Sequence, residues 1–183
     1  SYPYPFMCGQ PDPNLFNQAS WRMCAMQALG KKEFDSLTSD YAEQDDPELI
    51  NFIVRHTLPR RGILARPEQV LVTVGAQNAL WMAAQILLNG DRSAAFENPG
   101  YHGINEILRH TGCRQYPVNI DENGLPPNML PKEFDALFVT PSHQCPTTVT
   151  MPMSRRHELL RLAKERNFLI VEDDYEFEMS FIK

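Results

Sequence analysis

The chain has 183 residues, with 17 Lys and Arg against 23 Asp and Glu, a formal net charge of −6, and it is 43% hydrophobic and 22% charged. This length can bury a core, and the composition is that of an ordinary globular protein, which argues against disorder, collagen and coiled coil. The acidic excess argues against direct binding of a nucleic-acid backbone by this segment, and no apolar stretch reaches the length of a membrane span.

The first third of the chain is predicted to hold an extended arm followed by helices. Prolines and a glycine punctuate the first 20 residues, and each proline removes an amide donor and disfavours helix in the residue before it. Helical patterns follow over residues 21–29 and 47–57. One face of the second helix holds Leu49, Phe52, Ile53 and His56. We expect residues 1–66 to form an N-terminal arm and helices.

From residue 67 onward, short apolar strands alternate with helical patterns. This alternation predicts parallel βαβ units, and so an α/β fold with a mostly parallel sheet covered by helices on both faces. The sequence predicts strands at residues 69–74, 93–97, 114–118, 136–140 and 168–171, and helices at residues 76–88, 101–110 and 154–166, the last with Ser154 as its N-cap. The chain stops shortly after the last predicted strand, which would leave a sheet edge uncovered. We therefore expect either a fragment or a partner that supplies the rest.

The four cysteines are scattered and form no CxxC pair. A disulfide scaffold or a zinc site would need closer, repeated spacing. We therefore expect free, mostly buried thiols in a reducing compartment, and a cytoplasmic protein. The chain also opens without the basic and apolar segments of a secretory signal.

Polar residues follow the predicted strands at the sheet edge where ligands bind in parallel α/β proteins. After the first strand, Gly75, Ala76 and Gln77 lead into a helix, whose free amides and dipole favour an anion such as phosphate. The alternative is a helix start with a small residue for packing. After the second strand, a turn presents Tyr101, which either stacks on a planar ligand or is structural.

Two further strand ends carry polar side chains. Residues 140–148 form a proline-stiffened loop in which His143 is either a base or a hydrogen-bonding loop residue. Residues 172–178 hold five carboxylates. They favour a magnesium site, a single carboxylate that binds a cationic ring nitrogen, or a solvated acidic loop.

Together the four strand ends supply the parts that pyridoxal phosphate requires: a phosphate cradle, a stacking aromatic ring, a polar loop and a carboxylate for a protonated pyridine nitrogen. The segments GQPDPNLF (9–16), GDRSAAFENPGYHG (90–103), VTPSHQCPTTVTMPMSRRHELLRLA (139–163) and VEDDYEFE (171–178) resemble those of fold type I, class I/II aminotransferases. The resemblance is greatest to the aminotransferase-like domain of MocR-type regulators in the GntR superfamily, and it covers nearly the whole chain.

The resemblance implies a role for each of seven residues in binding the cofactor. The implied roles are Gly75, Ala76 and Gln77 on the phosphate, Tyr101 stacked on the pyridine ring, Asp173 paired with the ring nitrogen, Tyr175 at the ring hydroxyl, and Tyr41 at the phosphate of the neighbouring subunit. No metal is implied. The chain departs from the family pattern at Thr148, where glycine is usual, at Asn17, where proline is usual, and in the acidic stretch after Tyr41.

The resemblance also implies that catalytic parts of the family are missing from this chain. The Schiff-base lysine and the substrate-carboxylate arginine are expected beyond Lys183, and a winged-helix DNA-binding domain is expected before Ser1. Residues 67–183 would then be the first part of the large cofactor-binding domain, and this piece alone is expected not to catalyse transamination.

Three functions from different classes follow. The first is an effector domain of a MocR-type transcription regulator: a homodimer that binds pyridoxal phosphate, senses an amino compound and contacts DNA only through another domain. The second is a fragment of a true aminotransferase. The third is a magnesium-dependent phosphotransferase that uses the carboxylates at 172–178, which would leave Gln77 and Tyr101 unexplained.

Overall fold

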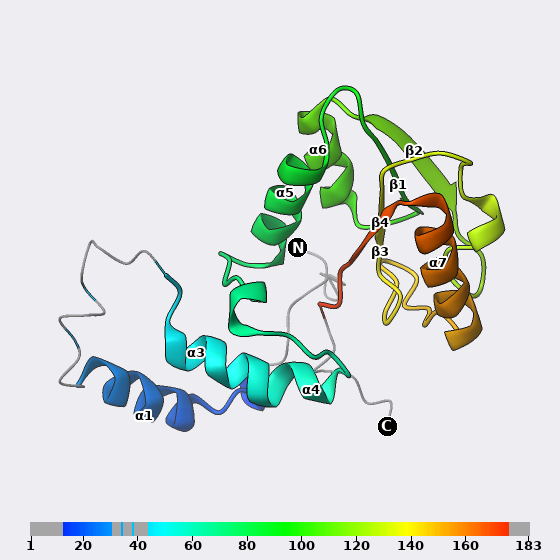
Figure 1. Cartoon of the computed structure of the whole chain (residues 1–183). Coiled ribbons are helices and arrows are strands. Elements are labelled where there is room, and N and C mark those ends of the chain that lie inside the picture. Colours follow the sequence, from blue (N-terminus) through cyan, green and yellow to red (C-terminus); the bar gives the residue numbers. More distant parts are fainter. Residues whose placement is uncertain (1–12, 31–33, 35–37, 39–43, 176–183) are drawn as a thin grey trace, which may run out of the picture. The chain divides into compact units, whose positions relative to one another are not determined.

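The structure, a computed structural model, describes residues 13–30, 34, 38 and 44–175 (Figure 1). The chain divides into two compact units, Ser1–Leu71 and Val72–Lys183, each of which is described by itself. Most of the predicted arm, the candidate Tyr41 and the end of the acidic segment lie outside the described residues. The division after residue 66 that the sequence suggests stays a prediction.

The first unit is helical. Its elements are η1 (Pro13–Leu15), α1 (Gln18–Leu29), α3 (Pro47–Phe52), η2 (Ile53–Thr57), α4 (Leu58–Arg60) and η3 (Pro67–Gln69). Helix α1 begins inside the predicted extended arm because Asn17 caps it: the Asn17 side chain accepts a hydrogen bond of 3.0 Å from the Ser20 amide. Asp46 caps α3 in the same way, on the Leu49 amide at 2.8 Å. The helix predicted to end at residue 57 continues to Arg60.

The face that helical spacing defines on the second helix is not the buried face of α3. Ile50 is its buried residue, whereas Leu49 and Phe52 expose 44% and 59% of their surface. Phe52 does contact His56, with ring centroids 4.9 Å apart. Helical spacing predicts which residues share a face, but the element that covers the helix decides which face is buried.

The second unit contains a four-stranded parallel sheet. Its strands are β1 (Ser93–Asn98), β2 (Arg114–Asn119), β3 (Ala136–Val139) and β4 (Leu169–Glu172), in the order β2-β1-β3-β4. In the register, Ala95 of β1 lies opposite Tyr116 of β2 and Leu137 of β3. Helices α5 (Ala76–Leu87), α6 (His102–Thr111) and α7 (Met153–Arg166) connect or flank the strands, with η4 (Pro127–Met129) in a loop. The predicted α/β class is confirmed.

Two apolar clusters form the core, one on each face of the sheet. Phe96 and Phe138 pack with residues of α5 and α6, while their neighbours Ala95 and Leu137 pack with residues of α7. Figure 1 shows α5 and α6 together on one side of the strands and α7 on the other. Successive side chains of a strand point to opposite faces, so a strand covered on both faces reads as a continuous apolar run.

Two local predictions in this unit are wrong. Residues 69–74 form no strand, and Leu71 and Val74 are 64% and 92% exposed. A β-branched run becomes a strand only when another strand pairs with it, and none of the described strands does. Ser154 does not cap α7: the carbonyl of Pro152 accepts from the Arg155 and Arg156 amides at 3.0 and 3.1 Å, so the helix begins one residue earlier.

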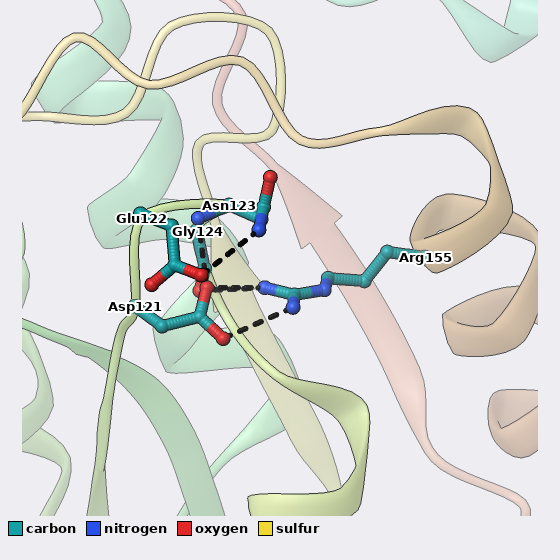
Figure 2. Close-up of polar contacts among 5 residues, drawn as sticks. All are labelled: Asp121, Glu122, Asn123, Gly124 and Arg155. Carbon is teal, nitrogen blue, oxygen red and sulfur yellow. Dashed lines mark hydrogen bonds and ion pairs between the residues drawn. The ribbon is translucent and has the colours of Figure 1, made fainter.

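An ion pair joins the turn after β2 to α7 (Figure 2). The Arg155 guanidinium donates to both carboxylate oxygens of Asp121, at 2.7 and 3.0 Å, and to the Gly124 carbonyl at 3.0 Å. The Asn123 amide also donates to Asp121, at 2.8 Å. These hydrogen bonds, that from Arg155 first, hold the pKa of Asp121 below its ordinary value. A bidentate Arg–carboxylate pair has a defined geometry, so it fixes the turn against the helix.

The cysteines and helices bear on two further expectations. Three cysteines lie among the described residues, all as free thiols: Cys113 is buried, Cys145 half-buried and Cys24 exposed. The expectation of mostly buried thiols is therefore wrong for Cys24. None of the described helices is long and apolar enough to cross a membrane.

The loop after β3 contains a strained residue. Thr148 has a φ of 66°, in the left-handed region that costs a β-branched residue about 1–2 kcal/mol. Its amide donates to the Gln144 carbonyl at 2.7 Å, which closes the turn. The family glycine that the sequence lacks at this position would adopt this φ without strain.

We predict that Thr148→Gly raises the free energy of unfolding by roughly 0.5–1 kcal/mol, because the relieved strain exceeds the entropy cost of a glycine. Urea unfolding at neutral pH measures the change. The matched control is Thr147→Gly, which should destabilise, since the Thr147 hydroxyl donates to Gln144 Oε1 at 2.6 Å. A Thr148→Gly variant no more stable than the wild type would contradict the prediction.

Candidate functional site

A pocket opens where the strands of the parallel sheet end. Strands β1, β3 and β4 each deliver a polar residue to it within one residue of their ends: Glu97, Thr140 and Asp173. Apolar side chains from α5, α6 and the sheet form its floor. The lining residues are Leu80, Glu97, Gly100, Tyr101, Ile104, Phe138, Val139, Thr140, Val171 and Asp173.

The starts of α5 and α6 come together beside this pocket. The Tyr101 hydroxyl donates a hydrogen bond to Gln77 Oε1, which joins two residues that are far apart in the sequence. Gly75 precedes α5 with a φ of 83°, a conformation that suits glycine, and offers no side-chain cap. The first amides of α5, those of Ala76 and Gln77 among them, therefore have no acceptor within the helix. An anion is the natural partner of such a helix start.

Gly103 fixes the position of the Tyr101 ring, and the sequence analysis missed it. A Cβ on Gly103 would lie 2.5 Å from Tyr101 Cε1 and 2.7 Å from its hydroxyl oxygen. The bare α-carbon therefore leaves the space that the ring occupies. Gly100 is needed for another reason, since its Cβ would lie 2.4 Å from the Glu97 carbonyl oxygen. The sequence does contain a signal for Gly103: it is a glycine two residues after Tyr101, the aromatic residue at the start of the helix.

Asp173 enters the pocket directly after β4. Its amide donates to the Val139 carbonyl at 3.0 Å, which extends the strand pairing and sets the direction of the side chain. Burial raises the pKa of the Asp173 carboxyl, and the adjacent Asp174 charge raises it further. Among the described residues, no basic side chain pairs with Asp173. Asp174 is also half-buried but is not part of the pocket lining.

Tyr175 and His143 contact each other. Their ring centroids are 6.1 Å apart and the rings are nearly perpendicular, at 83°. Neither residue belongs to the pocket lining, and Tyr175 is 44% exposed. The structure therefore brings five of the seven predicted cofactor residues to the pocket or to the helix starts beside it, while Tyr175 lies against His143 and Tyr41 is outside the described residues.

Glu97 is a charged residue of the pocket for which the sequence predicted no role. It is 5% exposed, and its Oε2 accepts hydrogen bonds from the Thr140 amide, the Thr140 hydroxyl and the Gln144 side chain, at 3.2, 2.6 and 3.2 Å. Burial raises the pKa of Glu97 more than these hydrogen bonds lower it. A glutamate at the end of an otherwise apolar strand was the signal that could have found it.

Residues 16–175 match the family described as Aminotransferase class I and II. The chain belongs to this family. It is 52% identical to the HTH-type transcriptional regulator TauR of Rhodobacter capsulatus, over 100% of this chain and 38% of that protein. It is 30% identical to the 2-aminoadipate transaminase of Thermus thermophilus, over 96% of this chain and 44% of that protein. The chain thus spans less than half the length of these relatives.

Solved aminotransferases share this fold. An archaeal alanine:glyoxylate aminotransferase superposes with a TM-score of 0.81 at 27% identity, over 90% of this chain and 43% of that one. LysN, the α-aminoadipate aminotransferase of Thermus thermophilus, complexed with N-(5'-phosphopyridoxyl)-L-leucine, superposes at 0.79 and 29% identity, over 92% and 43%. These matches confirm the predicted fold type I architecture, and the family implies pyridoxal phosphate as the cofactor.

The residues at the strand ends of this aminotransferase-family chain fit that cofactor. The Asp173 carboxylate is half-buried without a basic partner among the described residues, so a cationic ring nitrogen would compensate its burial. The start of α5 provides backbone amides for a phosphate, and the Tyr101 ring is fixed by Gly103 and by its bond to Gln77. The pocket and the helix start beside it thus offer a charge, an aromatic surface and an anion site.

We predict that Gly103→Ala displaces the Tyr101 ring and weakens pyridoxal phosphate binding about tenfold or more, with little change in stability, because the atoms that must move are the free end of one side chain. A cofactor titration by absorbance and a urea unfolding curve measure the two effects. The matched control is Gly90→Ala, where a Cβ meets nothing within 4 Å. Equal cofactor affinity in both variants would contradict the prediction.

Proposed function

We propose that this chain is the cofactor-binding part of an aminotransferase-like effector domain in a MocR-type transcription regulator, and that the domain binds pyridoxal phosphate and responds to an amino compound. The observation that carries the proposal is the Asp173 carboxylate, half-buried in the same pocket as Tyr101 and without a basic partner among the described residues. A buried charge needs a counter-charge, and a protonated pyridine nitrogen supplies one.

Each candidate residue would then have a definite task. Asp173 holds the ring nitrogen protonated, Tyr101 covers the ring, and the amides at Gly75, Ala76 and Gln77 bind the phosphate. The bound cofactor supplies an electron-withdrawing ring. Tyr175 at the ring hydroxyl and Tyr41 at the phosphate of a second subunit remain assignments by resemblance, and they go with a proposed homodimer.

Sequence similarity supports a regulator over an enzyme. The identity to TauR, 52%, is well above the 30% to the 2-aminoadipate transaminase. The HTH-type pyridoxine biosynthesis transcriptional regulator PdxR of Corynebacterium glutamicum is 32% identical over 95% of this chain and 37% of that protein. Both relatives are HTH-type transcriptional regulators, so we propose that the full-length protein contacts DNA through a domain outside this chain.

A true aminotransferase is the second candidate, because the solved structures with this fold are aminotransferases. The magnesium-dependent phosphotransferase has less support, since the chain belongs to the aminotransferase family and this family accounts for the Tyr101–Gln77 pair.

One experiment separates regulator from enzyme. The full-length protein, loaded with pyridoxal phosphate, is given a panel of amino acids and amines, and two readouts are taken: its affinity for the DNA upstream of its own gene, and the appearance of 2-oxo acid. We expect at least one amino compound to change DNA affinity, with oxo-acid formation no faster than free cofactor manages. Steady oxo-acid production without DNA binding would establish the enzyme alternative.

The site assignment predicts a contrast between adjacent aspartates. Asp173→Asn should weaken pyridoxal phosphate binding by roughly 10- to 100-fold, the equivalent of 1.5–3 kcal/mol for a hydrogen bond to a charged group, and should shift the cofactor's absorption spectrum. Asp174→Asn is the control and should do little. Absorbance titration of both full-length variants is the measurement. The reverse result would place the wrong aspartate at the ring, and no effect in either would make the acidic segment a solvated surface.

A further inference from the structure

Two carboxyl groups share the pocket at the strand ends, and only one of them has a task so far. Glu97 is the next-to-last residue of β1 and Asp173 follows β4, and both line the pocket. Burial raises the pKa of Glu97, and the charge of Asp173 raises it further. When two carboxyl groups line one poorly solvated pocket, the charge of one disfavours ionisation of the other.

The surroundings decide which carboxyl keeps the proton. Glu97 is 5% exposed, whereas Asp173 is only half-buried and can be reached by water or by a ligand. The charged form is disfavoured more strongly at the more deeply buried group. These surroundings favour the charge on Asp173 and the proton on Glu97.

The hydrogen bonds of Glu97 leave one of its two oxygens for a proton. Three donors converge on Oε2, from Thr140 and from the Gln144 side chain. The other oxygen, Oε1, is buried and has no hydrogen-bond partner among the described residues. An ionised carboxylate only accepts hydrogen bonds, so this oxygen would be left uncompensated in the charged form. A proton on Oε1 removes this uncompensated charge, and a neutral group costs less to bury than a charged one.

We propose that Glu97 is a positioning residue for Asp173: it stays an uncharged acid, anchored through Oε2 and with a proton on Oε1, so that Asp173 alone carries the negative charge of the pocket. One negative charge matches one cationic ring nitrogen, whereas two would leave an excess charge in a desolvated site. The role of Asp173 toward the cofactor rests on the proposed function, but the protonation of Glu97 does not.

Few other groups near Glu97 can titrate. Of the residues that line the pocket, Tyr101 and Asp173 are the other titratable ones, and α5 and α6 otherwise contribute Leu80 and Ile104. The loop after β3 contributes Thr140 and Gln144, which are uncharged. Asp174 acts on Asp173 rather than on Glu97. A pH transition at Glu97 can therefore be assigned with few variants.

The test is the pH dependence of unfolding of the full-length, cofactor-free protein, compared with Glu97→Gln. The amide keeps an acceptor for the three donors and a donor in place of the protonated Oε1. A carboxyl whose folded pKa is raised stabilises the fold below its ordinary value of roughly 4.3, and this stabilisation is lost as pH rises toward the folded pKa. Over that window the unfolding equilibrium constant of the wild type should rise by up to about tenfold per pH unit relative to Glu97→Gln.

The control is Glu133→Gln, which changes an exposed carboxyl outside the pocket and should give a profile parallel to the wild type. An infrared difference spectrum provides a second readout: the carbonyl band of a protonated, buried carboxyl at neutral pH, absent from Glu97→Gln. If the two groups are coupled, removing the charge of Asp173 makes Glu97 easier to ionise. The band should then persist to a higher pH in the wild type than in Asp173→Asn.

The outcomes separate this inference from the proposed function. Parallel unfolding profiles for the wild type and Glu97→Gln, with no protonated-carboxyl band, overturn the inference even if pyridoxal phosphate binds. A band whose pH of disappearance is the same in Asp173→Asn overturns the coupling of the two carboxyls. A protein that shows both the band and its coupling, yet takes up no pyridoxal phosphate, retains the inference and loses the proposed function.

Discussion

Three hydrogen bonds onto one oxygen of Glu97 hold together the edge of the sheet where the pocket lies. They bring the end of β1 to Thr140, just past the end of β3, and to Gln144 in the following loop. The side-chain nitrogen of Gln144 also donates to the Pro99 carbonyl at 2.9 Å, so it connects the loop to the turn before Tyr101. Because Gln144 is 1% exposed, water cannot replace these bonds, and the position of the aromatic ring depends on them.

The two faces of the sheet have different tasks. The cluster with α5 and α6 includes Leu80, Ile104 and Phe138, which also line the pocket, so its packing sets the shape of the site. The cluster with α7 lies on the other face, and the Arg155–Asp121 pair fixes a turn there. Because successive side chains of a strand point to opposite faces, the second face supports the pocket from behind and contributes Val139 to its lining.

The sequence predicted the elements whose pattern is local and missed what depends on distant contacts. The strands of the parallel sheet and helices α5, α6 and α7 were found within a residue or two, since each has its own apolar periodicity. The segment at 69–74 has the same composition but no pairing partner among the described strands, so propensity alone gave the wrong answer. Gly103 and Glu97 were missed because their importance lies in the space beside Tyr101 and in donors more than 40 residues away along the chain.

The strain at Thr148 is offset by the same residue that anchors Glu97. The Gln144 carbonyl accepts from the Thr148 amide, and the Gln144 side-chain oxygen accepts from the Thr147 amide and hydroxyl, at 3.0 and 2.6 Å. The side-chain nitrogen of Gln144 thus donates to Glu97 in the pocket, while its side-chain and backbone oxygens accept from the turn. An unfavourable φ can persist where surrounding hydrogen bonds determine the backbone so fully. The loop therefore tolerates a threonine in a glycine conformation because its central glutamine is held from both sides, and the geometry of the pocket is preserved at a local cost in stability.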